Sequence, residues 1–68
     1  MNRIDKIRKR LKLARMKKGF SQDYVGEQLR ISQISYHKIE NGKTTLKVST
    51  LIQLANILGV TVKYLLVC

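Results

Sequence analysis

The sequence is poor in the residue types that carry disulfide, metal and catalytic chemistry. It has one cysteine, Cys68, so no disulfide can form within the chain, which is typical of a reducing cytoplasm. It has one histidine, His37, without the Cys, Asp or Glu partners that a set of metal ligands needs. These residues and the scattered serines form no arrangement that would activate a nucleophile. We therefore expect a cytoplasmic protein that is not an enzyme and binds no metal and no cofactor.

The sequence also lacks an apolar run of about 20 residues, the length that crosses a bilayer. Its most apolar segment, residues 51–68, is interrupted by polar residues and a glycine: Gln53, Asn56, Gly59, Thr61 and Lys63. No apolar segment typical of a secretion signal stands near the N-terminus. We expect no membrane-spanning segment.

Acidic residues are scarce. Four Asp and Glu stand against 14 Lys and Arg, which gives a formal net charge of +10 on 68 residues, a length typical of one domain (1–68). A smaller excess would suffice for solubility. This excess indicates a polyanionic partner, either nucleic acid or an anionic membrane surface.

What the sequence does contain is a series of short helical patterns. Apolar residues recur at three- and four-residue intervals from Arg3 to Lys18, at Ile4, Ile7, Leu11 and Ala14, which predicts a first helix. This segment holds nine of the 14 basic residues and is followed by Gly19. Ser21 is a predicted N-cap for a second helix, Gln22 to Leu29, and Ser32 for a third, Gln33 to Glu40. Gly26 lowers helix stability, which suggests that another helix passes very close to it.

Two further helices are predicted after the Asn41-Gly42 turn signal. The fourth runs from Val48 to Leu58 with an apolar stripe of Val48, Leu51, Ile52, Ala55 and Leu58. Thr61 could cap a short fifth helix that reaches Leu66. No strand pattern competes, so the sequence predicts an all-α fold of five helices.

The stretch SQISYHKIENG, residues 32–42, is unusual for ordinary packing. Four of its side chains share one flank that should face water, although one of them is apolar: Gln33, Ile34, His37 and Lys38. Two short helices joined by a tight turn, the first with a small residue, form a helix-turn-helix pattern, here at about residues 21–40.

The chain resembles the Xre/Cro/lambda-type repressor family of bacterial and phage DNA-binding domains. The resemblance rests on GFSQDYVGEQLRISQISYHKIENGK, continues through STLIQLANILGV and covers roughly residues 7 to 66. It implies a five-helix lambda-repressor-like domain that binds double-stranded DNA, with the third helix in the major groove. The exposed flank is then explained, because it would be buried against DNA.

The resemblance also implies roles for particular residues. Ser21 and Gln22 would present the N-terminus of the second helix to a phosphate, and the exposed flank that begins at Ser32 would read base edges through Gln33, Ile34 and Lys38. His37 matches an exposed position, whereas Tyr36 and Ile39 match buried ones. The following loop would hold the sugar-phosphate backbone through Asn41, Lys43, Thr44 and Thr45. Arg15 would pair with Glu40.

The chemistry of these side chains is compatible with such roles. A Gln side chain such as Gln33 can bridge adenine N6 and N7, and Ile34 could contact a thymine methyl group. Lys38 could read guanine or touch phosphate, and these alternatives remain equal. For His37 an exposed polar position or a phosphate contact is favoured over a ligand or base role.

Three residues depart from the family pattern. Arg30 stands where the family usually has Gly, at a turn position that often needs a positive φ. Gly26 replaces the usual Ala. Tyr36 is larger than the usual aliphatic residue, and its hydroxyl needs a partner if it is buried.

The basic run Arg8-Lys9-Arg10-Lys12 lies on the first predicted helix. It is predicted to be mostly solvated and to contribute long-range attraction to DNA.

We therefore expect a sequence-specific DNA-binding transcriptional regulator, a repressor that acts as a homodimer. The predicted dimer interface is the apolar C-terminal tail, with Cys68 close to it: Val62, Leu65, Leu66 and Val67. An antitoxin, a restriction-modification controller or a phage immunity repressor would use the same module. A basic protein that acts on membranes or single-stranded RNA is a weaker alternative, because the sequence lacks aromatic stacking platforms.

Overall fold

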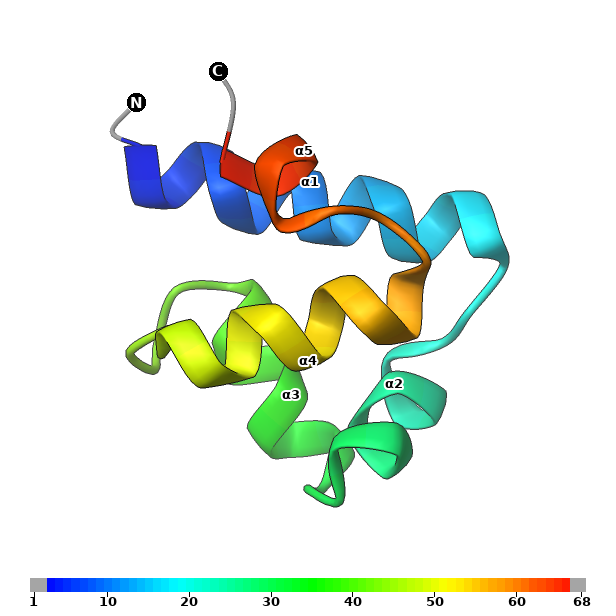
Figure 1. Cartoon of the computed structure of the whole chain (residues 1–68). Coiled ribbons are helices and arrows are strands. Elements are labelled where there is room, and N and C mark those ends of the chain that lie inside the picture. The colour runs from blue at the N-terminus through cyan, green and yellow to red at the C-terminus, as the bar shows by residue number, and fades with distance from the viewer. Residues whose placement is uncertain (1–2, 67–68) are drawn as a thin grey trace.

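The computed structural model describes residues 3–66 and contains, over that range, five helices and no strand. The helices are α1 (Arg3–Lys18), α2 (Gln22–Leu29), α3 (Gln33–Glu40), α4 (Val48–Leu58) and α5 (Val62–Leu66). Figure 1 shows α1 and α5 on one side of the molecule, α4 across the middle, and α2 and α3 on the opposite side. The predicted all-α fold of five helices is confirmed.

Both predicted N-caps of the helix-turn-helix are present. The Ser21 hydroxyl accepts a hydrogen bond from the Tyr24 backbone N–H at 3.0 Å, and the Ser32 hydroxyl accepts one from the Ser35 N–H at 3.0 Å. These caps fix the residues at which α2 and α3 begin, and only a short turn lies between the two helices.

The turn between α2 and α3 depends on two residues that depart from the family pattern. Arg30 ends α2 in the left-handed region with φ 62°, as expected for a position where glycine is usual. A Cβ on Gly26 would lie 3.2 Å from the backbone oxygens of Ile31 and Ser32. The close approach at Gly26 is therefore made by the turn itself and not, as predicted, by another helix.

The hydrophobic core draws on all five helices. Its fully buried side chains are Leu11, Val25, Tyr36, Leu54, Leu58 and Leu65. Leu54 was not in the predicted stripe of α4, whereas Val48 and Ile52 were and are exposed. The buried stripe follows the spacing 51, 54, 55 and 58, and Ile52 lies about 100° around the helix from Leu51. Ile4, in the first turn of α1, belongs to the predicted apolar stripe of that helix but is also exposed.

The C-terminal helix belongs to this core. Leu65 is 1% exposed and Val62 packs against the core, while Leu66 is exposed. Because Leu65 and Val62 pack in the core of one chain, these two residues do not form the dimer interface predicted at the C-terminal tail. Val67 and Cys68 lie outside the described residues.

Candidate nucleic-acid interface

The outer flank of α3 is open to solvent along its whole length. Gln33, Ile34, His37 and Lys38 are all exposed, as is the capping residue Ser32. Ile34 is 69% exposed, which is unusual for an isoleucine on a helix whose inner face holds the buried Tyr36 and Ile39. The structure thus places the four side chains of this flank together, with nothing in the described chain covering them.

The loop of residues 41–45 continues this surface beyond the C-terminus of α3. Asn41, Lys43, Thr44 and Thr45 are exposed. The loop is held to α3 through its backbone, since the Lys43 N–H donates to the Lys38 carbonyl oxygen at 2.8 Å. The predicted base-reading residues and the predicted backbone-contacting residues therefore lie next to each other.

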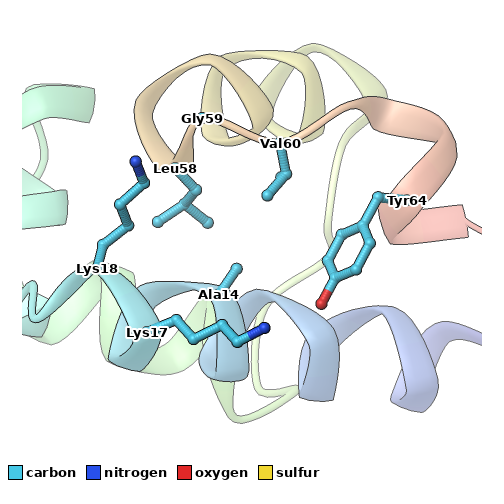
Figure 2. Close-up of a pocket in the computed structure, with 7 residues that line it drawn as sticks. All are labelled: Ala14, Lys17, Lys18, Leu58, Gly59, Val60 and Tyr64. Atoms are coloured by element: carbon cyan, nitrogen blue, oxygen red, sulfur yellow. The ribbon is translucent and has the colours of Figure 1, made fainter.

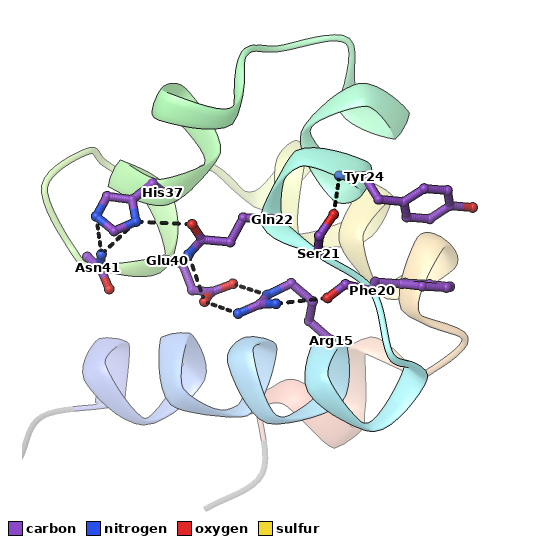
Figure 3. Close-up of polar contacts among 8 residues, drawn as sticks. All are labelled: Arg15, Phe20, Ser21, Gln22, Tyr24, His37, Glu40 and Asn41. Carbon is purple, nitrogen blue, oxygen red and sulfur yellow. Dashed lines mark hydrogen bonds and ion pairs between the residues drawn. The ribbon is translucent and has the colours of Figure 1, made fainter.

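An ion pair fixes α3 against α1. The Arg15 guanidinium donates from Nε to Glu40 Oε2 and from a terminal nitrogen to Glu40 Oε1, each at 2.9 Å. Its other terminal nitrogen donates to the Phe20 carbonyl oxygen at 2.8 Å. Figure 3 shows Arg15 extending from α1 to Glu40, beside the chain that enters α2. One side chain therefore ties the last turn of α3 to the end of α1 and to the start of the helix-turn-helix.

Burial and the ion pair act in opposite directions on Glu40. Burial alone raises the pKa of this carboxyl, but the hydrogen bonds from Arg15 and Gln22 and the nearby Tyr36 hydroxyl outweigh it, so the pKa is lowered. The hydrogen bond to Glu40 raises the pKa of Arg15, and burial raises the pKa of Tyr36. Both members of the pair are thus charged at neutral pH.

The Tyr36 hydroxyl lacks the hydrogen-bond partner that its burial calls for. It is fully buried and has no partner of ordinary hydrogen-bond geometry among the described residues. It faces the charged pair of Arg15 and Glu40, which interacts with it electrostatically.

Gln22 links this ion pair to the exposed flank. Its amide nitrogen donates to Glu40 Oε1 at 3.3 Å, and its amide oxygen lies 3.1 Å from His37 Nδ1. His37 Nε2 in turn lies 2.7 Å from the Asn41 amide nitrogen. The Asn41 amide nitrogen also lies 3.2 Å from His37 Nδ1, so the imidazole ring sits between the Gln22 and Asn41 amides. Two of the residues predicted to meet DNA, Gln22 and Asn41, are thus positioned by a third, His37.

The basic run on α1 is not uniformly solvated, which corrects the prediction. Lys9 and Lys12 are exposed, but Arg8 is only 8% exposed. Arg10 donates to the Tyr64 carbonyl oxygen at 2.6 Å and lies over the Tyr64 ring, 5.6 Å from its centre. The residues that sequence reasoning missed are therefore Arg8 and Arg10. A signal for Arg8 existed in the spacing 8, 11, 15, which puts it on the face of α1 that also carries Leu11 and Arg15.

A hollow of about 370 Å³ lies between α1, the turn after α4, and α5 (Figure 2). Its floor is apolar and two lysines of α1 stand at its edge; the lining residues are Ala14, Lys17, Lys18, Leu58, Gly59, Val60 and Tyr64. These residues include no acid, histidine or cysteine. Across residues 3–66, no three His, Cys, Asp or Glu side chains are grouped to hold a metal ion. No helix within that range is long and apolar enough to span a membrane.

The sequence of this chain matches a known family and is similar to a known protein. Residues 8–67 match the family described as a helix-turn-helix domain. Over 57 residues the chain is 44% identical to the SPbeta prophage-derived uncharacterized HTH-type transcriptional regulator YonR of Bacillus subtilis (strain 168). That match covers 84% of this chain and 53% of the relative, so the chain spans about half the length of this curated relative. No solved structure is significantly similar to the chain.

Proposed function

Because this chain belongs to the helix-turn-helix domain family, we propose that it binds duplex DNA sequence-specifically and regulates transcription as a cytoplasmic repressor. The observation that carries this proposal is the exposed flank of α3. An isoleucine that is 69% exposed stands there beside Gln33 and Lys38, on a helix joined to α1 by the Arg15–Glu40 pair. Such a flank is suited to burial against a partner with both polar and apolar groups, as the edges of base pairs are.

In the proposed complex α3 enters the major groove by its N-terminus. Gln33 and Ile34, in the first turn, would meet base edges, with the Gln33 amide on adenine and the Ile34 side chain on a thymine methyl group. Lys38, in the last turn, would contact guanine or phosphate. Ser21 and Gln22 at the start of α2, and Asn41, Lys43, Thr44 and Thr45 in the 41–45 loop, would contact the sugar-phosphate backbone.

The net charge supports the same partner. A charge of +10 would draw the chain to a phosphate backbone and make the affinity fall steeply with salt. Most of that charge lies on α1, where exposed side chains such as Lys9 and Lys12 would contribute attraction without sequence preference. Charge therefore favours association in general, and the α3 flank would supply specificity.

The homodimer is proposed because one helix-turn-helix contacts few bases, and two half-sites about 34 Å apart give useful specificity. Since Leu65 and Val62 belong to the core, we place the interface on α4 instead. Val48 and Ile52 are 72% and 49% exposed, lie four residues apart on one side of α4, and belong to a helix with no charged residue. On a chain of charge +10, an uncharged apolar face is where a second copy meets least repulsion.

The dimer is tested by sedimentation equilibrium of the wild type and of a Val48→Lys/Ile52→Lys variant, free and on a palindromic duplex. We expect two copies per palindrome for the wild type and weaker, less cooperative binding for the variant. A wild type that stays monomeric both at high concentration and on the palindrome contradicts the dimer.

DNA recognition is tested by comparing two alanine variants on a duplex selected from a random library and on a scrambled duplex. Gln33→Ala should cost about 1–3 kcal/mol on the selected duplex only and relax the preference at one base pair. Lys43→Ala should weaken binding to both duplexes alike and lower the salt slope by about 1. Equal losses on both duplexes for Gln33→Ala would show that Gln33 reads no base.

A basic helix such as α1 could instead act on anionic membranes. Measuring the affinity of the chain for anionic vesicles and for duplex DNA at the same salt concentration separates the two functions. We expect the duplex to bind more tightly. Among regulators, the prophage-derived description of the Bacillus subtilis relative favours a phage immunity repressor over an antitoxin or a restriction-modification controller.

A further inference from the structure

Arg8 reaches from α1 across to the far end of α3. One terminal nitrogen of its guanidinium donates to the Ile39 carbonyl oxygen, and the other donates to the Thr44 carbonyl oxygen at 2.8 Å. These acceptors are 31 and 36 residues away in the sequence. The side chain is 8% exposed, while Lys9 beside it is exposed. Arg8 is therefore built into the protein and is not part of the solvated basic face.

The two acceptors bracket the 41–45 loop. Ile39 lies in the last turn of α3, before the loop, and Thr44 lies within it. Between them the loop passes directly over the Arg8 side chain, since a Cβ on Gly42 would lie 3.7 Å from Arg8 Cδ and Nε. The guanidinium also places positive charge at the C-terminus of α3, where it is favourable to the helix dipole. Arg8 thus joins the end of α3 to Thr44 in the loop, in addition to the backbone hydrogen bond from Lys43 to Lys38.

We propose that Arg8 is a positioning residue for DNA binding: it holds the 41–45 loop in the conformation in which Lys43, Thr44 and Thr45 meet the phosphate backbone. This inference rests on the proposed function of the loop. A loop that is already ordered in the free protein loses less conformational freedom on binding, and this raises affinity without any new contact. The planar fork of arginine suits two separate carbonyl acceptors, whereas a lysine ammonium is a single point of charge on a flexible stem.

The test is a double-mutant cycle on duplex affinity. Arg8→Met removes the donors and keeps an unbranched apolar stem, and Lys43→Ala removes the phosphate contact. Arg8→Met should weaken binding roughly tenfold, which corresponds to about 1.4 kcal/mol, equally on selected and scrambled duplexes. If Arg8 acts through the loop, the double variant loses clearly less than the product of the two single losses. Independent, multiplicative losses would overturn the proposal, as would an Arg8→Met variant with wild-type affinity.

Two further measurements separate positioning from charge and from global unfolding. Arg8→Lys keeps the charge and should lose most of the affinity that Arg8→Met loses, whereas Lys9→Met, the same loss of charge at the exposed neighbour, should lose much less. In the free protein, amide hydrogen exchange at Gly42 and Lys43 should accelerate at least tenfold in both Arg8 variants, with α1 and α2 unchanged. If Arg8→Lys has the duplex affinity and the amide exchange rates of the wild type, only the charge of Arg8 matters and the proposal is overturned. If the wild type binds no duplex, the proposed function fails, while hydrogen exchange still reports whether Arg8 orders the loop.

Discussion

Replacing Glu40 by Gln perturbs the contact that holds α3 in place. The substitution keeps the size of the side chain but removes the charge, and it turns an amide NH₂ toward the Arg15 nitrogens that now donate to Glu40 at 2.9 Å. The Glu40 side chain is 1% exposed and that of Arg15 is 11% exposed, so the arginine charge would be left largely desolvated.

The expected cost is large for so small a protein. Breaking a buried ion pair by removing one partner costs about 3–5 kcal/mol. We expect the lower end, near about 3 kcal/mol, because Arg15 keeps its bond to the Phe20 carbonyl oxygen and can tilt toward water. At roughly 0.05–0.15 kcal/mol per residue, total stability for this length is about 3–10 kcal/mol. Glu40→Gln should therefore remove roughly 30% or more of the free energy of unfolding.

Urea denaturation followed by circular dichroism measures this loss, with Glu27→Gln as the control. Glu27 is an exposed carboxylate on α2, and its substitution should change stability by less than about 0.5 kcal/mol. A loss below about 1 kcal/mol for Glu40→Gln at pH 7 would show that the Arg15–Glu40 contact behaves as a solvent-exposed ion pair and not as a buried one.

The pH dependence provides an independent check. Because the pKa of Glu40 is lowered on folding, its contribution is complete above the unfolded value of about 4.3 and is lost as pH falls through the folded value. The stability gap between wild type and Glu40→Gln should therefore be constant from pH 7 to about 5 and close below about pH 4. A gap that persists unchanged to pH 2 would contradict the assigned direction of the shift.

Three other substitutions test the turn and the exposed flank. Arg30→Gly should raise the free energy of unfolding by up to about 1 kcal/mol, because φ 62° is strained for arginine but not for glycine; thermal denaturation would show no gain if the strain is absent. Gly26→Ala should lower it by about 1–3 kcal/mol, since the new Cβ would meet two backbone oxygens at 3.2 Å; a stabilised variant would mean that the turn can move. Ile34→Ala should abolish the loss of affinity caused by replacing one thymine by uracil, and should leave the melting temperature of the free protein unchanged; a lowered melting temperature with no thymine effect would place Ile34 in the core.

The helices and their caps could be predicted from the sequence because their signals are local. Ser21 and Ser32 precede helical periodicity and cap the following turns, and Gly59 ends α4 in the left-handed region. The positive φ at Arg30 followed from the position it occupies in the family pattern. These features depend on a few consecutive residues, and no tertiary contact has to be known in advance.

Tertiary features were predicted less well. Periodicity places Val48 and Ile52 near the apolar stripe of α4, but the packing of α4 against α1 and α2 decides which edge of the stripe is covered. Burial of Tyr36 was implied by the resemblance, yet its hydroxyl lacks the expected hydrogen-bond partner among the described residues. Arg8 looked like one charge in a solvated run, because its two acceptors are backbone carbonyls more than 30 residues away. No pattern in side-chain types records such a contact.

We propose the α3 flank and the 41–45 loop as the DNA-binding surface, although α1 carries most of the positive charge. Titrating ¹⁵N-labelled protein with a selected duplex, and following backbone amide shifts by NMR, tests this most directly. We expect the largest shifts at residues 32–38 and 41–45 and in the first turn of α2, with much smaller shifts for a scrambled duplex. Shifts concentrated along α1, with α3 unmoved and no difference between the two duplexes, would contradict it.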